Sequence, residues 1–177
     1  MIFSLKFKEI FHVDKYHPYV KTFEVTDKNN NFISLLYTDF YPRKSKRGGA
    51  WMTSYKQQSM RDKKNIRPHI SIVCNFTKPT KDKPSLLTFN EVTTLFHEFG
   101  HALHGILANT KYKSLSGTNV LWDFVELPSQ LFENWCYEEK ALNIFAKHYE
   151  TGKKIPIELI KKIKNSSNFN QASQTLR

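Results

Sequence analysis

Two histidines and a glutamate occur within five consecutive residues, His97, Glu98, Phe99, Gly100 and His101. On a helix, residues four apart lie on one face a single turn from each other, so His97 and His101 could bind one metal ion. Glu98 would then accept a proton from a water at the metal rather than bind the metal itself. The spacing is the H-E-x-x-H pattern of zinc proteases, and it predicts metal-assisted hydrolysis of a peptide bond.

The surrounding sequence predicts the helix that this motif requires. From Thr88 to Leu107 the chain reads TFNEVTTLFHEFGHALHGIL, and its apolar residues recur at steps of three and four. Thr88 or Asn90 could cap the start, with Glu91 in the first turn. Polar groups inside so apolar a helix need a metal or hydrogen bonds. The alternative, two core histidines bonded to backbone carbonyls, is disfavoured by Glu98 beside them.

A catalytic zinc site needs a third protein ligand and one open position. His104 lies about 10 Å along the helix from His97, too far to share a metal whose bonds are about 2 Å. The extended motif H-E-x-x-H-x-x-G-x-x-H is absent, because its glycine position holds His104 and its last histidine position holds Leu107. We therefore expect the third ligand to be a carboxylate from a second segment. The downstream candidates are Asp123, Glu126 and Glu133.

That second segment, Leu121 to Lys147, has the apolar spacing of a helix. Its apolar side is formed by Phe124, Leu127, Leu131, Trp135, Leu142 and Phe145. Because Pro128 would disrupt a helix interior, the helix should either begin close to Asp123 or kink beside Glu126. Both carboxylates would then lie beside buried surface, and the spacing alone leaves the choice of ligand open.

Longer stretches of the chain resemble a known family. HEFGHALH (97–104), SLSGTN (114–119) and DFVELPSQ (123–130) are similar to the thimet oligopeptidase and bacterial peptidyl-dipeptidase family of zinc metallopeptidases. Within that family, these stretches are most similar to the bacterial peptidyl-dipeptidase branch. Upstream, YHPYVKTFEV, DFYPRKSKRGGAWM and RPHISIVCNFTKP resemble the same family in the same order. The resemblance covers most of the chain.

The resemblance implies an enzyme, a zinc metallopeptidase that hydrolyses short peptides. It implies that His97, His101 and Glu126 bind one Zn²⁺ per chain and that Glu98 is the catalytic base. Resemblance to the peptidyl-dipeptidase branch favours release of C-terminal dipeptides, with internal cleavage of oligopeptides as the alternative. A metal-binding fragment without activity is a further alternative.

Two other acids, Glu91 and Asp123, could orient the imidazoles of the metal ligands. The alternative for each is a helix cap or an acid in the first turn of a helix. Neither role is fixed by the spacing.

The first part of the chain predicts a small antiparallel sheet. Residues 22–26 and 32–40 are β-rich runs joined by DKNNN, which favours a tight reversal, and residues 70–76 form another apolar run. Zinc peptidases of this type hold the substrate as an extra strand at a sheet edge. By resemblance, the segment Gly48 to Met52 and the loop Ser116 to Thr118 should line the cleft; the alternative is that Gly48 and Gly49 only make a turn. Their expected substrate contacts are Gly49, Ala50, Ser116, Gly117 and Thr118.

Together these elements predict an α+β fold, with a mainly α-helical zincin-type catalytic core and a small antiparallel β-sheet. Residues 1–177 would form one partial catalytic domain, with a β-rich substrate edge (1–84) and a helical zinc-binding part (85–177). Members of the resembled family are several-fold longer, and residues 168–177 continue a helical pattern without a stop signal. We therefore expect a fragment of a larger helical peptidase, lacking N- and C-terminal parts. Because a Gly-, Tyr- and His-rich segment that completes the family's site is absent, this chain alone should be poorly active.

The net charge of +11 does not predict nucleic-acid binding. Basic residues outnumber acidic ones in residues 1–84 and 151–177 but not in residues 85–150, which hold the metal motif. No recognised nucleic-acid module accompanies them, so short peptides are the expected partners. Cys74 and Cys136 give no disulfide framework, and no apolar run reaches membrane-spanning length. These features favour the cytoplasm, with the periplasm as the alternative.

Overall fold

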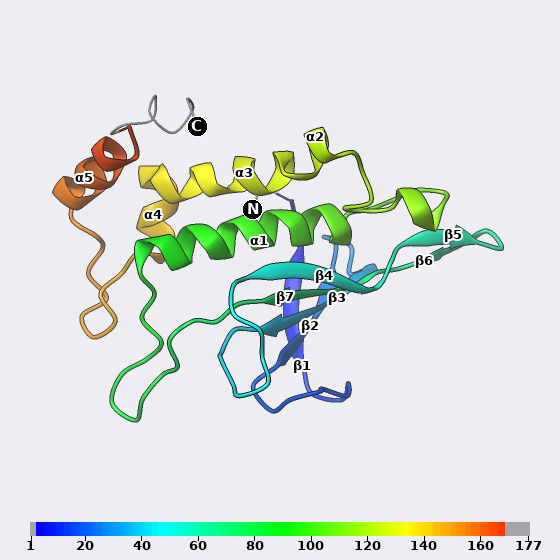
Figure 1. The fold of residues 1–177 in the computed structure, drawn as a ribbon, viewed down its shortest axis with the longest axis horizontal. Helices are drawn as coiled ribbons and strands as arrows, with labels where there is room; N and C mark the ends of the chain where they lie inside the picture. Colours follow the sequence, from blue (N-terminus) through cyan, green and yellow to red (C-terminus); the bar gives the residue numbers. More distant parts are fainter. Residues whose placement is uncertain (1–2, 169–177) are drawn as a thin grey trace.

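The computed structural model describes residues 3–168, in which one sheet is covered by helices on one side (Figure 1). Five strands form the main sheet in the order β1-β2-β3-β7-β4. They are β1 (Lys6–Ile10), β2 (Lys21–Thr26), β3 (Phe32–Asp39), β4 (Trp51–Lys56) and β7 (His69–Val73). A separate two-stranded ribbon consists of β5 (Ser59–Arg61) and β6 (Lys64–Ile66). β4 is therefore an edge strand of the main sheet.

The sheet is mixed, which corrects the prediction of an antiparallel sheet. β2 pairs antiparallel with β1 and with β3, and β4 pairs antiparallel with β7, but β3 and β7 are parallel. The chain reverses direction between β3 and β4 and again between β4 and β7. Because β7 enters the sheet between β3 and β4, it runs in the same direction as β3. Apolar runs identify strands but not the path that connects them.

The three predicted β-rich runs correspond to β2, β3 and β7. The expected reversal lies between β2 and β3, where Asp27 Oδ1 accepts hydrogen bonds from the N–H groups of Asn29 and Asn31, each at 2.8 Å. Asn30 has a φ of 65°, in the left-handed region that Asn tolerates. β1 was not predicted, and Gly48–Met52 was expected only as a cleft segment.

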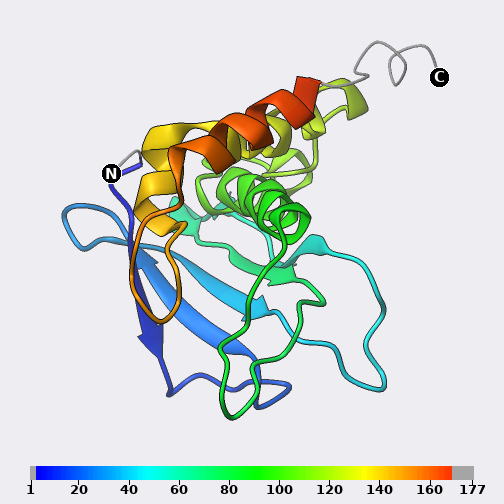
Figure 2. The same cartoon turned by 90° about the vertical axis from the view of Figure 1, so that its left-hand side faces the viewer.

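The helices are α1 (Phe89–Ile106), α2 (Trp122–Val125), α3 (Leu127–Glu133), α4 (Glu139–Phe145) and α5 (Ile157–Asn168). Two short 3₁₀ turns, η1 (Lys113–Leu115) and η2 (Asn134–Tyr137), connect them. Figure 2 shows α1 nearly end-on, between the sheet and the other helices. None of the described helices is long and apolar enough to span a membrane. The helical pattern predicted for residues 168–177 lies beyond Asn168 and outside the described residues.

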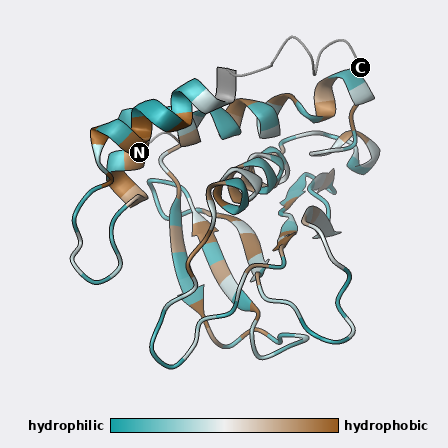
Figure 3. Ribbon diagram, turned by 60° about the vertical axis from the view of Figure 1, so that its left-hand side comes forward, coloured by the Kyte–Doolittle hydropathy of each residue, from teal (hydrophilic) through white to brown (hydrophobic). Residues whose placement is uncertain are grey.

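α1 is the helix predicted around the metal motif. Thr88 caps it: Thr88 Oγ1 accepts a hydrogen bond from the Glu91 N–H at 3.3 Å, and Glu91 Oε2 accepts one from the Thr88 N–H at 2.8 Å. This reciprocal pair satisfies two backbone N–H groups at the helix start. The apolar side of α1 packs on the sheet, where Leu103 and Ile106 join Ile70 in the core. Figure 3 shows apolar and polar residues alternating along the strands beneath.

The segment predicted as one helix from Leu121 to Lys147 is divided into α2, α3, η2 and α4. Glu126 ends α2 and begins α3, and Pro128 lies in the first turn of α3. Proline is tolerated there because the first N–H groups of a helix have no partner within the helix. The predicted kink beside Glu126 is confirmed, and the single long helix is wrong.

The apolar side expected for that segment is largely uncovered in the described residues. Leu131 is 61% exposed and Leu127 is 55% exposed, whereas Leu142 is only 2% exposed. The breaks at Glu126 and η2 turn these side chains in different directions, so they do not form one buried stripe.

Candidate metal centre

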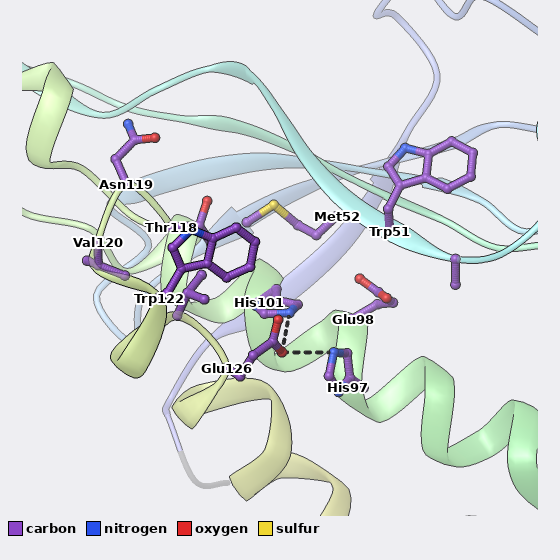
Figure 4. Close-up of a pocket in the computed structure, with 12 residues that line it drawn as sticks. Trp51, Met52, His97, Glu98, His101, Thr118, Asn119, Val120, Trp122 and Glu126 are labelled. Atoms are coloured by element: carbon purple, nitrogen blue, oxygen red, sulfur yellow. Dashed lines mark ion pairs between the residues drawn. The ribbon is translucent and has the colours of Figure 1, made fainter. Parts of the chain in front are cut away.

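The two histidines of α1 and Glu126 point toward one another (Figure 4). His97 Nε2 and His101 Nε2 each lie 3.2 Å from Glu126 Oε2. One donor atom from each of the three residues lies within 4.8 Å of the others, and no other group of this kind occurs in residues 3–168. His104 is not part of the group.

The spacing of these donors fits a shared metal ion. Two ligands with bonds of about 2.0–2.1 Å at tetrahedral angles lie roughly 3.3 Å apart. The observed separations to Glu126 Oε2 are 3.2 Å. Two imidazoles and one glutamate are also a donor set used by catalytic zinc, in which the fourth position stays open.

Glu133 determines which nitrogen of His97 is free for a metal. His97 Nδ1 lies 2.6 Å from Glu133 Oε1 and donates to it, because a carboxylate accepts hydrogen bonds. A neutral His97 ring then presents its Nε2 lone pair to Glu126 Oε2, which is also an acceptor. Two facing acceptors repel each other unless a cation lies between them. A metal ion, or a second proton on the ring, removes this repulsion.

The charge states of the neighbouring groups also suit a metal. Burial lowers the pKa of His101, which favours the neutral ring that a metal requires. A hydrogen bond from Ser129 Oγ at 2.8 Å lowers the pKa of Glu126 and so favours its charged carboxylate. Burial raises the pKa of Glu98, as suits a group that has to take up a proton.

A close contact between α1 and α3 positions the ligands from the two elements. A Cβ built on Gly100 would lie 2.6 Å from Pro128 O and from Ser129 Cα. Such short contacts do not occur between real atoms, so only glycine allows the two backbones to approach this closely. The contact therefore sets the distance between the histidines of α1 and Glu126.

The three donors and Glu98 line an open pocket of about 560 Å³. One wall is the edge strand β4, with Trp51 and Met52, and another is the loop between α1 and α2, with residues 118–120 (Figure 4). Trp122 of α2 also lines the pocket and is 89% exposed. The metal donors are thus accessible from solvent, next to the strand that ends the sheet in the described part of the chain.

The predicted substrate residues are not all in this pocket. Ala50 and Thr118 line it. Gly49 lies outside the lining, in a bend before β4, with a φ of 90°. Ser116 is only 3% exposed, and Gly117 packs against α1 with a φ of 58°. Gly49, Ser116 and Gly117 do not line this pocket, and their contact with a peptide stays a prediction.

Neither acid expected to orient a ligand contacts a histidine in the described residues. The Glu91 carboxylate accepts hydrogen bonds from Thr88, so the alternative role of a helix cap describes it. Asp123 lies in the first turn of α2, which is its alternative role. The acid that contacts the other ring nitrogen of His97, Nδ1, is Glu133, which the sequence offered only as a possible third ligand. Its spacing is the signal, since it follows Glu126 by seven residues, two helical turns along the same face.

Comparisons with known proteins give the relatives of this chain. Residues 1–177 match the sequence model of Peptidase family M3. Dipeptidyl carboxypeptidase of Escherichia coli (strain K12) is 45% identical over 170 residues, 96% of this chain and 25% of that protein. Oligopeptidase A of the same organism is 44% identical over 178 residues, 99% of this chain and 26% of that protein. Saccharolysin of Saccharomyces cerevisiae is 39% identical over 185 residues, which are 99% of this chain and 26% of that protein. The chain spans about a quarter of the length of these curated relatives.

Proposed function

Because this chain belongs to peptidase family M3, we propose that it forms the zinc-binding catalytic part of a peptidase that hydrolyses short peptides. The family match confirms the resemblance drawn from HEFGHALH and DFVELPSQ. The observation that carries the proposal is the convergence of His97, His101 and Glu126 to within 4.8 Å. The α+β arrangement supports a zincin-type core, in which the motif helix α1 lies between the sheet and the helix that follows Glu126.

His97 and His101 would hold one zinc ion through Nε2, and Glu126 would hold it through a carboxylate oxygen. When bound, zinc lowers the pKa of a water and polarises a peptide carbonyl. Glu98 would act as the base, accepting a proton from the attacking water and donating it to the leaving amine nitrogen. Its position in the pocket and its raised pKa support this role.

The free edge of β4 supports a peptide as the substrate. In the described residues β4 pairs only with β7 in the main sheet, so backbone groups along its other side could pair with an extended peptide. Trp51 and Met52 place this edge beside Glu98 in the pocket (Figure 4). A peptide paired with β4 would therefore pass over the metal donors.

We propose removal of C-terminal dipeptides as the first form of the activity and internal cleavage of oligopeptides as the second. The dipeptidyl carboxypeptidase and the oligopeptidase A are 45% and 44% identical to the chain, so overall similarity does not separate the two forms. The chain spans about a quarter of these two relatives, so other parts of a longer parent protein would complete the active site. Mass spectrometry of a blocked decapeptide treated with that parent separates the two forms, as successive C-terminal dipeptides or as one internal cut.

Single-turnover cleavage tests the proposal on the chain itself. With zinc-loaded chain in excess over a short peptide, we expect slow cleavage that chelation abolishes and zinc restores. Glu98→Gln should reduce the rate about 10²–10⁴-fold while leaving zinc bound, because it removes only the proton acceptor. Cleavage by Glu98→Gln at the unmodified rate would contradict the proposal. Stoichiometric zinc without any cleavage would instead support an inactive metal-binding fragment.

A further inference from the structure

Gln58 lies just beyond β4, and its side chain is fully buried. Its Oε1 accepts hydrogen bonds from the Thr110 N–H at 2.8 Å, from Thr110 Oγ1 at 3.1 Å and from Ser116 Oγ at 3.4 Å. Its Nε2 donates to Thr110 O at 3.1 Å and to Asn65 Oδ1 at 2.9 Å. Both donors and the acceptor of this buried amide are therefore engaged.

These hydrogen bonds join two segments that line the candidate active site. β4 contributes Trp51 and Met52 to the pocket, and the loop between α1 and α2 contributes residues 118–120 (Figure 4). Gln58 follows the first segment, while Thr110 and Ser116 belong to the second. The amide thus connects two walls of the pocket without entering it.

The same loop is seated closely on α1. A Cβ at Gly117 would lie 3.1 Å from Gly105 Cα, so two glycines allow the loop and the helix to approach. This contact limits movement of the loop toward α1. The bonds from Gln58 limit its movement away from β4.

We propose that Gln58 is a positioning residue that holds the loop of residues 107–121 against β4 and fixes the width of the substrate pocket. This inference rests on the proposed function, because it concerns how a peptide is bound between these segments. Removing the amide would leave the Thr110 N–H without its acceptor, and the loop would become free to shift. Metal binding should persist, since no hydrogen bond of Gln58 in the described residues involves His97, His101 or Glu126.

Gln58→Met tests the proposal because it keeps the length of the side chain and removes its strong hydrogen-bonding groups. Gln57→Met is the matched control, since Gln57 makes no side-chain hydrogen bond in the described part of the chain. Both are made in the Glu98→Gln background, which lets a dye-labelled nonapeptide bind without turnover. Three quantities are measured: amide exchange at Thr110, zinc affinity by chelator competition, and peptide Kd by fluorescence anisotropy.

Gln58→Met should speed exchange at Thr110 and raise the peptide Kd, each on the order of tenfold, while zinc affinity stays within about twofold. Gln57→Met should change none of the three. Equal exchange and equal peptide affinity in the two variants would overturn the proposal. So would a parallel loss of zinc affinity in Gln58→Met, because that would show general loosening of the fold.

Gln58→Glu provides a second variant if Gln58→Met does not fold. It keeps an acceptor for the Thr110 N–H, but its buried carboxylate would face two acceptors, Thr110 O and Asn65 Oδ1, so a change in the same direction and at least as large is expected. Failure of the proposed function has a different signature: the Glu98→Gln chain with Gln58 intact would bind no peptide. Exchange at Thr110 would still respond to Gln58→Met, and an absent response would overturn the positioning role.

Discussion

At the residue scale, the metal centre depends on the orientation of one imidazole. The Nδ1–H of His97 is held by Glu133 Oε1 at 2.6 Å, which turns Nε2 toward Glu126. A carboxylate in this position fixes the tautomer and the ring orientation and makes the ligand nitrogen more basic. Glu133 is therefore expected to support metal binding without touching the metal.

Glu133→Gln removes the negative charge and keeps the size of the side chain. We expect zinc affinity, measured by competition with a chelator, to fall about 10–100-fold because the hydrogen bond to His97 loses its charged acceptor. Glu139→Gln, an exposed position on α4, is the control and should bind zinc as the unmodified chain does. Unchanged affinity in Glu133→Gln would show that His97 is oriented by its packing alone.

The sequence predicts some residues of the metal centre from spacing alone, others only by resemblance, and one contact not at all. The spacing of His97 and His101 follows directly from helix geometry, and the structure places their Nε2 atoms at equal distances from Glu126. Glu126 itself was chosen by resemblance, because Asp123 and Glu133 satisfied the spacing argument equally well. The contact of Glu133 was missed: its seven-residue spacing from Glu126 was the available signal, but the contact itself depends on how α3 packs against α1.

At the element scale, the site requires that α1 and α3 touch. Gly100 lies between the two ligand histidines in sequence, and its missing side chain is the space that Pro128 and Ser129 occupy. The break at Glu126 then lets the ligand carboxylate turn toward α1 while α3 continues along it. A small change in the contact between α1 and α3 should therefore affect both the free energy of unfolding and metal binding.

Gly100→Ala would place a methyl group 2.6 Å from backbone atoms of α3. An alanine normally stabilises a helix interior relative to glycine by about 1 kcal/mol, so a loss of stability would isolate the effect of the contact. We expect the free energy of unfolding in urea to fall by about 1–3 kcal/mol, together with zinc affinity. Gly48→Ala is the control, because no atom of the described residues lies within 4 Å of its added Cβ. Unfolding and zinc binding equal to those of the unmodified chain would refute this role for Gly100.

The elements were predictable where local patterns determine them. Thr88, Glu91 and the apolar spacing predict α1 to within one residue at each end. The parallel pairing of β3 with β7 was not predictable, because it follows from the route of the chain through β4. The exposed side chains of Leu127 and Leu131 had the spacing of a buried stripe, but nothing in the described residues packs over them.

At the scale of the whole molecule, a buried ion cluster ties together segments around the sheet. Asp39, at the end of β3, is 1% exposed and accepts hydrogen bonds from Arg43, Lys46 and Tyr16. Lys46 also donates to the backbone oxygens of Tyr41 and of Asp39 itself. Burial alone would raise the pKa of Asp39, but the hydrogen bonds from its three partners together lower it below the ordinary value.

This depressed pKa gives stability that is fully present above the ordinary Asp pKa of about 3.9 and is lost as the pH falls through the lower folded value. Asp39→Asn should lower the free energy of unfolding by about 3–5 kcal/mol at neutral pH, since Lys46 and Arg43 lose their buried counter-charge. The free energy of unfolding in urea should also depend less on pH below about pH 4 in this variant than in the unmodified chain.

Asp62→Asn is the control for that series, because Asp62 is exposed and its ion pair with Arg61 spans 3.7 Å at the surface. It should unfold as the unmodified chain does at every pH. A parallel acid-side decline in Asp39→Asn and the unmodified chain would contradict the assignment to Asp39.

The most direct test of the metal centre is the zinc content of the chain after chelation and reloading. The unmodified chain should bind about one zinc ion, since its three donors fit a single tetrahedral centre. His104→Ala should bind the same amount, because His104 is on α1 but outside the cluster of donors. His97→Ala and Glu126→Ala should each lose the ion. Full zinc content in both of these variants would contradict the site.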